Sequence, residues 1–219
     1  MEKDIHDRRP VRTRDTRWAA SAARTLQRLG CTPNAISLFS IVFSLLSALC
    51  FIAVWQLESL WMQRLLLLIA AAGIQGRLIC NLLDGMVAVE GGLRSPAGAI
   101  YNELPDRISD TVLFLGAGYG LTRLNGAAEL AWAASLLALF TAYVRLLGGT
   151  CGLAQRFSGP MAKQHRMAVL TAAALVGALL PVWGEVSLFG ALAIIALGAA
   201  WTIVRRTRTI LKALQQQEA

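Results

Sequence analysis

The chain has 219 residues, of which 56% are hydrophobic and only 16% are charged, and its formal net charge is +8. A soluble globular protein would carry about 25% charged residues, so the composition excludes that class and indicates an integral membrane protein. The lysines and arginines lie at the edges of apolar runs, where they favour the cytoplasmic side and anionic lipid, and nucleic acid is not expected as a partner. The 4 cysteines show no paired spacing, so neither disulfides nor a zinc site is predicted.

Residues 1–17 mix arginines with aspartates and lack apolar periodicity, which predicts a flexible basic arm. In residues 18–30, Trp18, Ala22, Leu26 and Leu29 alternate with arginines, a pattern typical of an amphipathic helix that lies on the membrane surface. The alternative is an ordinary solvated helix. Residues 18–219 are predicted to form one membrane domain.

About twenty apolar residues suffice for one membrane crossing, and the sequence offers six such runs. Their predicted limits are residues 35–55, 60–83, 97–121, 128–149, 167–183 and 186–204, followed by a cytoplasmic tail at 205–219. The expected fold class is therefore an all-α integral membrane protein with six transmembrane helices preceded by an interfacial helix. Most basic residues then fall on the side that holds both termini, which places the termini in the cytoplasm.

Aromatic residues near the span ends are expected to anchor the helices at the membrane interfaces. They are Trp55, Trp61, Trp132 and Trp183.

Polar residues inside the second and third spans form two stripes at helical spacing. The stripes are Arg77, Asn81 and Asp84 in the second span, and Asn102, Asp106 and Asp110 in the third. The spans run in opposite directions, so the rise of 1.5 Å per residue predicts three layers of facing residues. From the cytoplasmic side inward they are Asp84 with Asn102, Asn81 with Asp106, and Arg77 with Asp110 in the deepest layer. An unpaired charge is costly at that depth, which predicts a structural ion pair between them. The alternative is a polar seam that only joins two helices.

These residues resemble the signature of the CDP-alcohol phosphatidyltransferase family, D-x2-D-G-x2-A-R-x8-G-x3-D-x3-D. The spacing is kept without a gap from Asn81 to Asp106. Asn81 and Asn102 stand at the first and third aspartate positions, and Val89 stands at the arginine position. The entry Thr32-Pro33-Asn34 after a surface helix and the six-span layout extend the resemblance over most of the chain.

The resemblance implies an enzyme that moves a phosphatidyl group from CDP-diacylglycerol to a small alcohol and releases CMP. It implies that the four motif positions Asn81, Asp84, Asn102 and Asp106 hold one or two Mg²⁺ or Mn²⁺ ions, and that Asp106 is the catalytic base. Hard cations of this kind take oxygen ligands and stabilise charge on a pyrophosphate. The resemblance also implies a homodimer in a bacterial inner membrane, in contact with membrane lipids.

Substrate contacts are expected from small motif residues and from basic residues on the cytoplasmic side. They are Gly85, Ala88, Gly98, Arg94, Arg107, Arg145, Lys163 and Arg166. Lysine and arginine attract phosphate and anionic headgroups, although a plain positive-inside loop would also explain those at 163–166. The small-residue spacings Gly116 with Gly120 and Gly148 with Gly152 indicate close helix packing, either inside the chain or in a dimer.

Two function classes follow, and a third is the least favoured. The first is the transferase. The second is a catalytically weak or inactive family relative that acts as a membrane partner or regulator of lipid synthesis. A small transporter is the third, because paired intramembrane charges also occur in transport paths.

Overall fold

The computed structural model describes residues 16–90, 92–93, 96–154 and 159–218, so most of the predicted N-terminal arm lies outside the described residues. Within these ranges the chain is helical and contains no strand. The elements are α1 (Arg17–Arg28), α2 (Pro33–Val54), α3 (Leu60–Glu90), α4 (Gly98–Gly120), α5 (Ala127–Thr150), α6 (Lys163–Leu179), the 3-10 turn η2 (Pro181–Trp183) and α7 (Gly184–Glu218).

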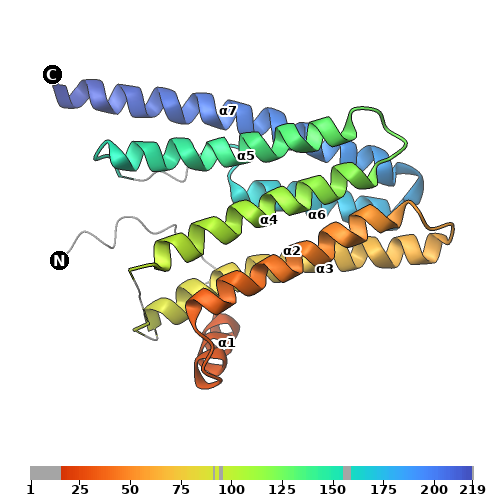
Figure 1. Cartoon of the computed structure of the whole chain (residues 1–219), viewed down its shortest axis with the longest axis horizontal. Coiled ribbons are helices and arrows are strands. Elements are labelled where there is room, and N and C mark those ends of the chain that lie inside the picture. The colour runs from red at the N-terminus through yellow and green to blue at the C-terminus, as the bar shows by residue number, and fades with distance from the viewer. Residues whose placement is uncertain (1–15, 91, 94–95, 155–158, 219) are drawn as a thin grey trace.

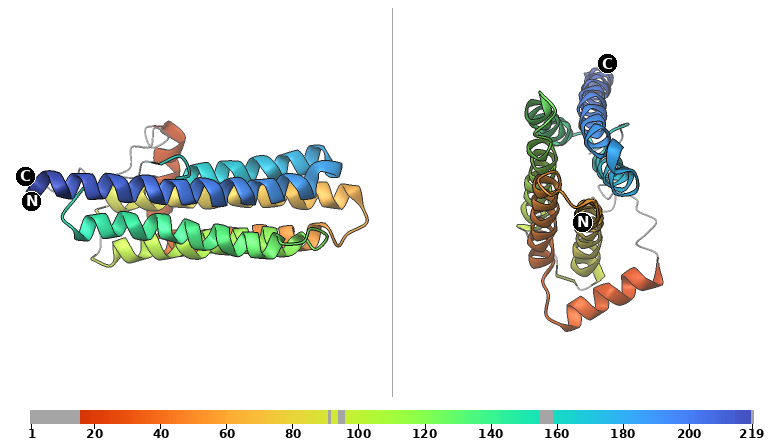
Figure 2. Two further views of the ribbon diagram at one scale, coloured as in Figure 1. Left: turned by 90° about the horizontal axis from the view of Figure 1, so that it is seen from above. Right: turned by 90° about the vertical axis from the view of Figure 1, so that its right-hand side faces the viewer.

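Helices α2 to α7 run alternately in opposite directions along one axis, and α1 lies across one end of this bundle (Figures 1 and 2). Apolar runs of this length adopt helices because a helix satisfies its backbone polar groups internally in lipid. Among the described residues, four segments are long and apolar enough to cross a membrane, namely α2, residues 60–89 of α3, α5 and Pro181–Gln217 of η2 and α7. For α4 and α6 the crossing stays a prediction.

Two helices extend beyond their predicted limits. Helix α3 continues from the expected end at Leu83 to Glu90, so the second half of the motif on this span is helical rather than a loop. Helix α7 continues through the predicted tail to Glu218. Residues 205–218 contain neither glycine nor proline and are rich in good helix formers, which explains why the helix does not stop at the end of the apolar run.

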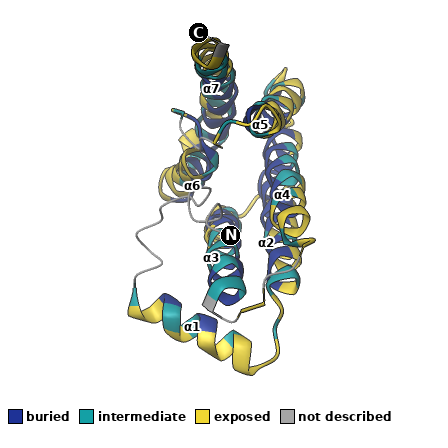
Figure 3. Cartoon of the chain, turned by 90° about the vertical axis from the view of Figure 1, so that its left-hand side faces the viewer, coloured by how far each residue is buried: buried dark blue, intermediate teal, exposed yellow. Residues whose placement is uncertain are grey.

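Helix α1 buries one narrow face against the bundle, flanked by the half-buried Ala20, Ala22 and Leu26, and exposes its other side (Figure 3). Its buried residues are Ala19 and Ala23, which belong to one hydrophobic cluster with Leu83 and Met86 of α3. Trp18 is 49% exposed and lines the cavity described below. The amphipathic helix therefore forms as predicted at Arg17–Arg28, and its place at the membrane surface stays a prediction.

Helix α2 contacts both α3 and α4, and small residues make this close packing possible. A Cβ atom at Gly116 of α4 would collide with Ala48 of α2, and one at Gly120 would collide with the Phe51 carbonyl oxygen. A Cβ atom at Gly73 of α3 would collide with the Ser47 hydroxyl. The Gly116 and Gly120 spacing thus supports packing inside the chain.

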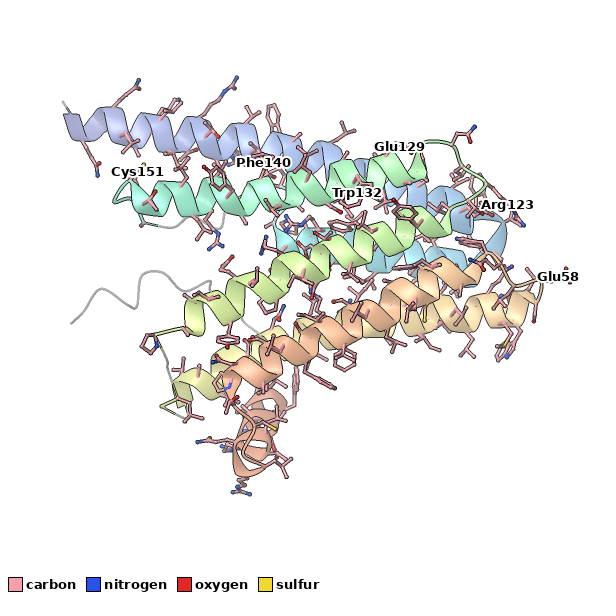
Figure 4. The ribbon with its side chains drawn as sticks, viewed as in Figure 1. Glu58, Arg123, Glu129, Trp132, Phe140 and Cys151 are labelled. Carbon is pink, nitrogen blue, oxygen red and sulfur yellow. The ribbon has the colours of Figure 1, made fainter. Side chains whose placement is uncertain are left out.

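The end of the bundle remote from α1 carries the short connections. There Arg123 forms an ion pair with Glu185 at 3.1 Å, and Figure 4 shows Glu58 and Arg123 at this end and Cys151 at the other. Trp61, Trp132 and Trp183 are more than half exposed, as interfacial anchors would be. The expectation for Trp55 is wrong, because its indole is buried against Gly184, whose missing side chain leaves room for the ring.

Candidate functional site

A cavity of about 660 Å³ lies at the end of the bundle where α1 crosses it. Every predicted metal or substrate residue among the described residues lines this cavity. These residues are Asn81, Asp84, Gly85, Ala88, Gly98, Asn102, Asp106, Arg107, Arg145, Lys163 and Arg166. Arg94 lies outside the described residues. Because α3 and α5 end here while α4 and α6 begin here, segments far apart in the sequence meet at one place (Figure 1).

The deepest charged layer is a chain of three buried side chains. Arg77 Nη2 lies 2.6 Å from Asp110 Oδ1, and Arg166 Nη2 donates a 2.7 Å hydrogen bond to Asp110 Oδ2. The predicted pair of Arg77 with Asp110 is therefore part of a larger network. Arg77 and Arg166 are at most 1% exposed, and such charges are tolerated only when they are paired and hydrogen-bonded.

Arg166 lines the cavity, and its guanidinium also has partners inside the protein, while its contact with substrate stays a prediction. Besides Asp110, its Nη1 donates to the Thr141 hydroxyl at 3.2 Å and to the Met161 carbonyl at 2.9 Å. Arg166 thus ties α6 to α4 and α5 beneath the cavity. Sequence reasoning could not distinguish it from Lys163, because both are basic residues at the start of one helix.

Asp106 is the most heavily contacted carboxylate of the site. Its Oδ1 accepts hydrogen bonds from Asn81 Nδ2 at 2.8 Å and from Lys163 Nζ at 2.5 Å. Arg77 Nη2 lies 3.6 Å from the same oxygen, and Arg107 Nη2 lies 3.7 Å from Oδ2. The middle layer thus holds Asn81 beside Asp106, and the Lys163 ammonium of α6 contacts the same carboxylate.

Asp84 has a partner that the two-stripe prediction missed. Its Oδ2 accepts a 2.5 Å hydrogen bond from the Ser37 hydroxyl of α2. No bond between Asp84 and Asn102 is present among the described residues, and Asn102 is exposed at the cavity. The signal was available in the sequence, since buried serines recur on α2 at spacings of three and four. They are Ser37, Ser40, Ser44 and Ser47.

The rim of the cavity contains a second ion-paired group. Arg145 Nη2 donates to Glu103 Oε1 at 2.6 Å, and Arg107 lies 3.9 Å from Glu103 Oε2. Glu103 lies off the predicted stripe, yet α5 brings Arg145 to it. Arg206, in the predicted tail, also lines the cavity and donates to the Thr141 carbonyl at 2.5 Å.

Helix ends add to the positive character of the cavity. Helices α4 and α6 both begin there, and neither first turn is capped by the side chain of its N-cap residue, Ala97 or Ala162. The amino end of a helix carries a partial positive charge and favours anions. With glycine and alanine in place of larger side chains at Gly85, Ala88 and Gly98, the cavity can admit a phosphate group close to the backbone.

A smaller cavity of about 80 Å³ lies beside the first, between the end of α5 and α7. Arg145 and Arg206 line both cavities, and Arg205 lines the smaller one. This region is therefore suited to an anionic group adjacent to the first site.

Comparisons with known proteins find similarity over most of the chain. No family model matches the sequence. The chain is 32% identical over 181 residues to the inner membrane protein YnbA of Escherichia coli, covering 82% of this chain and 84% of that protein.

Solved structures similar to this fold include Mycobacterium tuberculosis phosphatidylinositol phosphate synthase PgsA1 with CDP-DAG bound. That structure has a TM-score of 0.73 and 22% identity, covering 89% of this chain and 94% of that one. The same synthase in complex with manganese and citrate has a TM-score of 0.72 and 21% identity, with 88% of each chain covered. The chain therefore belongs to the family of the inner membrane protein YnbA, and it has the fold of the phosphatidylinositol phosphate synthases, which are CDP-alcohol phosphatidyltransferases.

Proposed function

We propose that this chain is a transferase of the inner membrane that moves a phosphatidyl group from CDP-diacylglycerol to a small alcohol and releases CMP. The observation that carries the proposal is the meeting of Asp84 and Asp106 with Lys163 and Arg107 in one cavity at an end of the bundle. A CDP-linked lipid has a pyrophosphate between nucleotide and acyl chains, and such a group requires cations at the membrane boundary. The fold neighbour with CDP-DAG bound supports this substrate class.

In the proposed reaction the alcohol oxygen attacks the phosphorus of the phosphatidyl group. The new P–O bond forms as the bond to CMP breaks, and CMP leaves with the electron pair. Asp106 accepts the hydroxyl proton through Oδ2, because Oδ1 is held by Lys163 and Asn81. Arg107 and Lys163 stabilise the charge on the phosphate oxygens, which is the main contribution a protein makes to phosphoryl transfer.

The divalent ion implied by the resemblance, and present as manganese in one fold neighbour, fits these residues poorly. Only two of the four motif positions are carboxylates, and no group of three or more His, Cys, Asp or Glu residues in the described part of the chain is placed to hold a metal ion. Asn81 offers its amide N–H to Asp106, and an ammonium contacts the same carboxylate. The proposed steps therefore use the side chains of the protein alone.

The acceptor is proposed to carry a negative charge of its own. Arg145 and Arg206 line both the main cavity and the smaller one beside it. Arginine binds phosphate and carboxylate groups through several N–H donors in one plane. A phosphorylated alcohol, or an amino acid with a hydroxyl side chain, would match this surface better than a neutral alcohol.

A second candidate function is lipid-nucleotide binding without turnover, in a membrane partner or regulator of lipid synthesis. It is favoured by the contacts of Asp106, whose Oδ1 has Lys163, Asn81 and Arg77 within 4 Å. A carboxylate stabilised by several cations is a weak base. Turnover by the purified protein distinguishes this candidate from the transferase.

The experiment that tests the proposal is release of CMP from CDP-diacylglycerol by purified protein with a panel of alcohols, both neutral and anionic. Release that depends on an acceptor and is lost in Asp106→Asn supports the transferase. Binding of CDP-diacylglycerol without CMP release from any acceptor supports the second candidate. Neither binding nor release would contradict both.

The proposed arrangement in the membrane has both termini and the cavity facing the cytoplasm, and two copies forming a homodimer. Arg145, Lys163 and Arg206 at the α1 end of the bundle support this orientation by the positive-inside tendency. Cysteine labelling at Cys151, which is exposed at this end, would report the orientation. Cross-linking in membranes would report the dimer.

A further inference from the structure

The charge balance around the deepest part of the cavity is the reverse of that in a metal site. Four basic side chains lie within 4 Å of the two carboxylates Asp106 and Asp110, and they are Arg77, Arg107, Lys163 and Arg166. A divalent cation is held by an excess of negatively charged oxygen ligands. With Asp84 of the same cavity included, four basic side chains stand against three carboxylates, so the local charge does not favour a further cation.

Among the described residues, Lys163 is the basic residue whose side chain lies nearest to Asp106. Its Nζ lies 2.5 Å from Asp106 Oδ1, its side chain is 15% exposed, and it lines the cavity from the first residue of α6. Asn81, at the first aspartate position of the motif, donates its amide N–H to the same oxygen. A carboxylate at position 81 would instead share the attraction of a metal ion with Asp106.

We propose that the ammonium of Lys163 takes the electrostatic role of a divalent cation, so that the cavity binds the pyrophosphate of a CDP-linked lipid without metal. This inference rests on the proposed function for its ligand. An ammonium group has three N–H donors, so Lys163 can hold Asp106 and a phosphate oxygen at the same time. Arg107 lies 3.7 Å from the other oxygen of Asp106 and provides the second positive charge at the cavity wall.

The asparagines at positions 81 and 102 agree with this arrangement. With a built-in monovalent cation, a site of four aspartates would hold excess negative charge and repel pyrophosphate. Asparagine keeps the size and one carbonyl oxygen of aspartate but removes the charge. Asparagine at positions 81 and 102 and the ammonium group of Lys163 therefore both reduce the negative charge of the cavity.

The test measures binding of a short-chain CDP-diacylglycerol to the full-length protein in nanodiscs by calorimetry, in EDTA and in excess Mn²⁺. Variants are Lys163→Met, Lys163→Arg and the matched control Lys212→Met, which changes an exposed lysine far along α7. We expect wild-type affinity to be the same in both buffers. Lys163→Met should weaken binding in EDTA by roughly tenfold to a hundredfold, as loss of a charged hydrogen bond does, while Lys163→Arg and the control retain it.

The outcomes separate this inference from the proposed function. Wild-type binding that requires Mn²⁺ would overturn the inference and leave the lipid-nucleotide site standing. Equal binding by wild type and Lys163→Met in EDTA would also overturn it. No binding in either buffer would contradict the proposed function, and the inference with it. The two wild-type measurements do not depend on whether any variant folds.

Discussion

The Ser37 hydroxyl of α2 donates a 2.5 Å hydrogen bond to Asp84 Oδ2 of α3, and both residues are at most 5% exposed. The bond connects α2, which carries none of the four metal-binding positions of the motif, to Asp84 of α3. Asp84 and Asp106 are the two of those positions that are aspartate in this chain. Removing the hydroxyl leaves the buried carboxylate with one fewer donor, which is destabilising for a charged group.

The first prediction concerns this bond. Ser37→Ala should reduce the free energy of unfolding by about 1–3 kcal/mol and weaken binding of CDP-diacylglycerol. The control is Ser44→Ala, because Ser44 is buried on the same helix and, within the described part of the chain, its hydroxyl donates to the Ser40 carbonyl of its own helix. Thermal unfolding in detergent measures the difference. Equal losses in the two variants would show that the contact with Asp84 contributes nothing specific.

The second prediction concerns the buried chain of charges. Asp110→Asn removes the carboxylate shared by Arg77 and Arg166 and should destabilise the protein by about 3–5 kcal/mol. The substitution leaves the buried Arg166 guanidinium without its carboxylate partner, and it leaves Arg77 with only the more distant carboxylate of Asp106 at 3.6 Å. Adding Arg77→Met should recover part of the loss. Glu185→Gln, in the pair with the exposed Arg123, should lose less than about 1 kcal/mol. Strictly additive losses from Arg77→Met and Asp110→Asn would argue against coupling.

The third prediction concerns metal affinity gained by substitution. Asn81→Asp combined with Asn102→Asp should lower the midpoint of thermal unfolding in EDTA, because the new carboxylate at 81 would lie beside Asp106. Mn²⁺ should raise the midpoint of this variant by binding its folded state. The same ion should leave wild type and the control Asn125→Asp, at the far end of the bundle, unchanged. A comparable Mn²⁺ shift in wild type would contradict the expectation.

The fourth prediction concerns helix packing. Gly116→Val should force α4 away from α2, because even a Cβ atom at this position would collide with Ala48, and should lower stability by about 1–3 kcal/mol. Gly190→Val on α7 is the control, because a Cβ atom at Gly190 would meet no atom of another described helix within 4 Å. Unfolding midpoints of the two variants give the comparison. A similar loss at both positions would indicate a general effect of valine in these helices.

The fifth prediction concerns acceptor choice. Arg145→Met should raise KM for an anionic acceptor in the CMP-release assay while leaving KM for a neutral alcohol unchanged. The reason is that Arg145 lines both cavities and contributes charge rather than a proton transfer. An equal rise for both acceptors would assign Arg145 to holding Glu103 in place rather than to recognition of charge.

Much of the fold could be predicted because apolar run length determines where membrane helices form. The positions of α2 and α5 follow from this signal alone. Ends of helices were harder, since α3 and α7 continue past their apolar runs wherever no residue stops them. The burial of Trp55 was also out of reach, because it depends on Gly184, more than a hundred residues later.

The site could be predicted within one helix pair and less well beyond it. Helical spacing was enough to place Asn81 beside Asp106 and Arg77 beside Asp110 as expected partners. Contacts from other helices, such as Lys163 to Asp106 and Ser37 to Asp84, depend on how helices are arranged around each other. A charge pattern indicates that a residue needs a partner but does not say which helix supplies it.

The close approach of α2 to both α3 and α4 has a consequence for substrate size. The two halves of the motif lie on α3 and α4, and each of these helices packs against α2. The size of the side chains at these two contacts therefore influences the distance between α3 and α4, and with it the width of the cavity. Related chains with bulkier residues at the positions of Ala48 or Gly73 would hold these two helices farther apart. Such chains would accommodate a larger headgroup without any change in the residues that line the cavity.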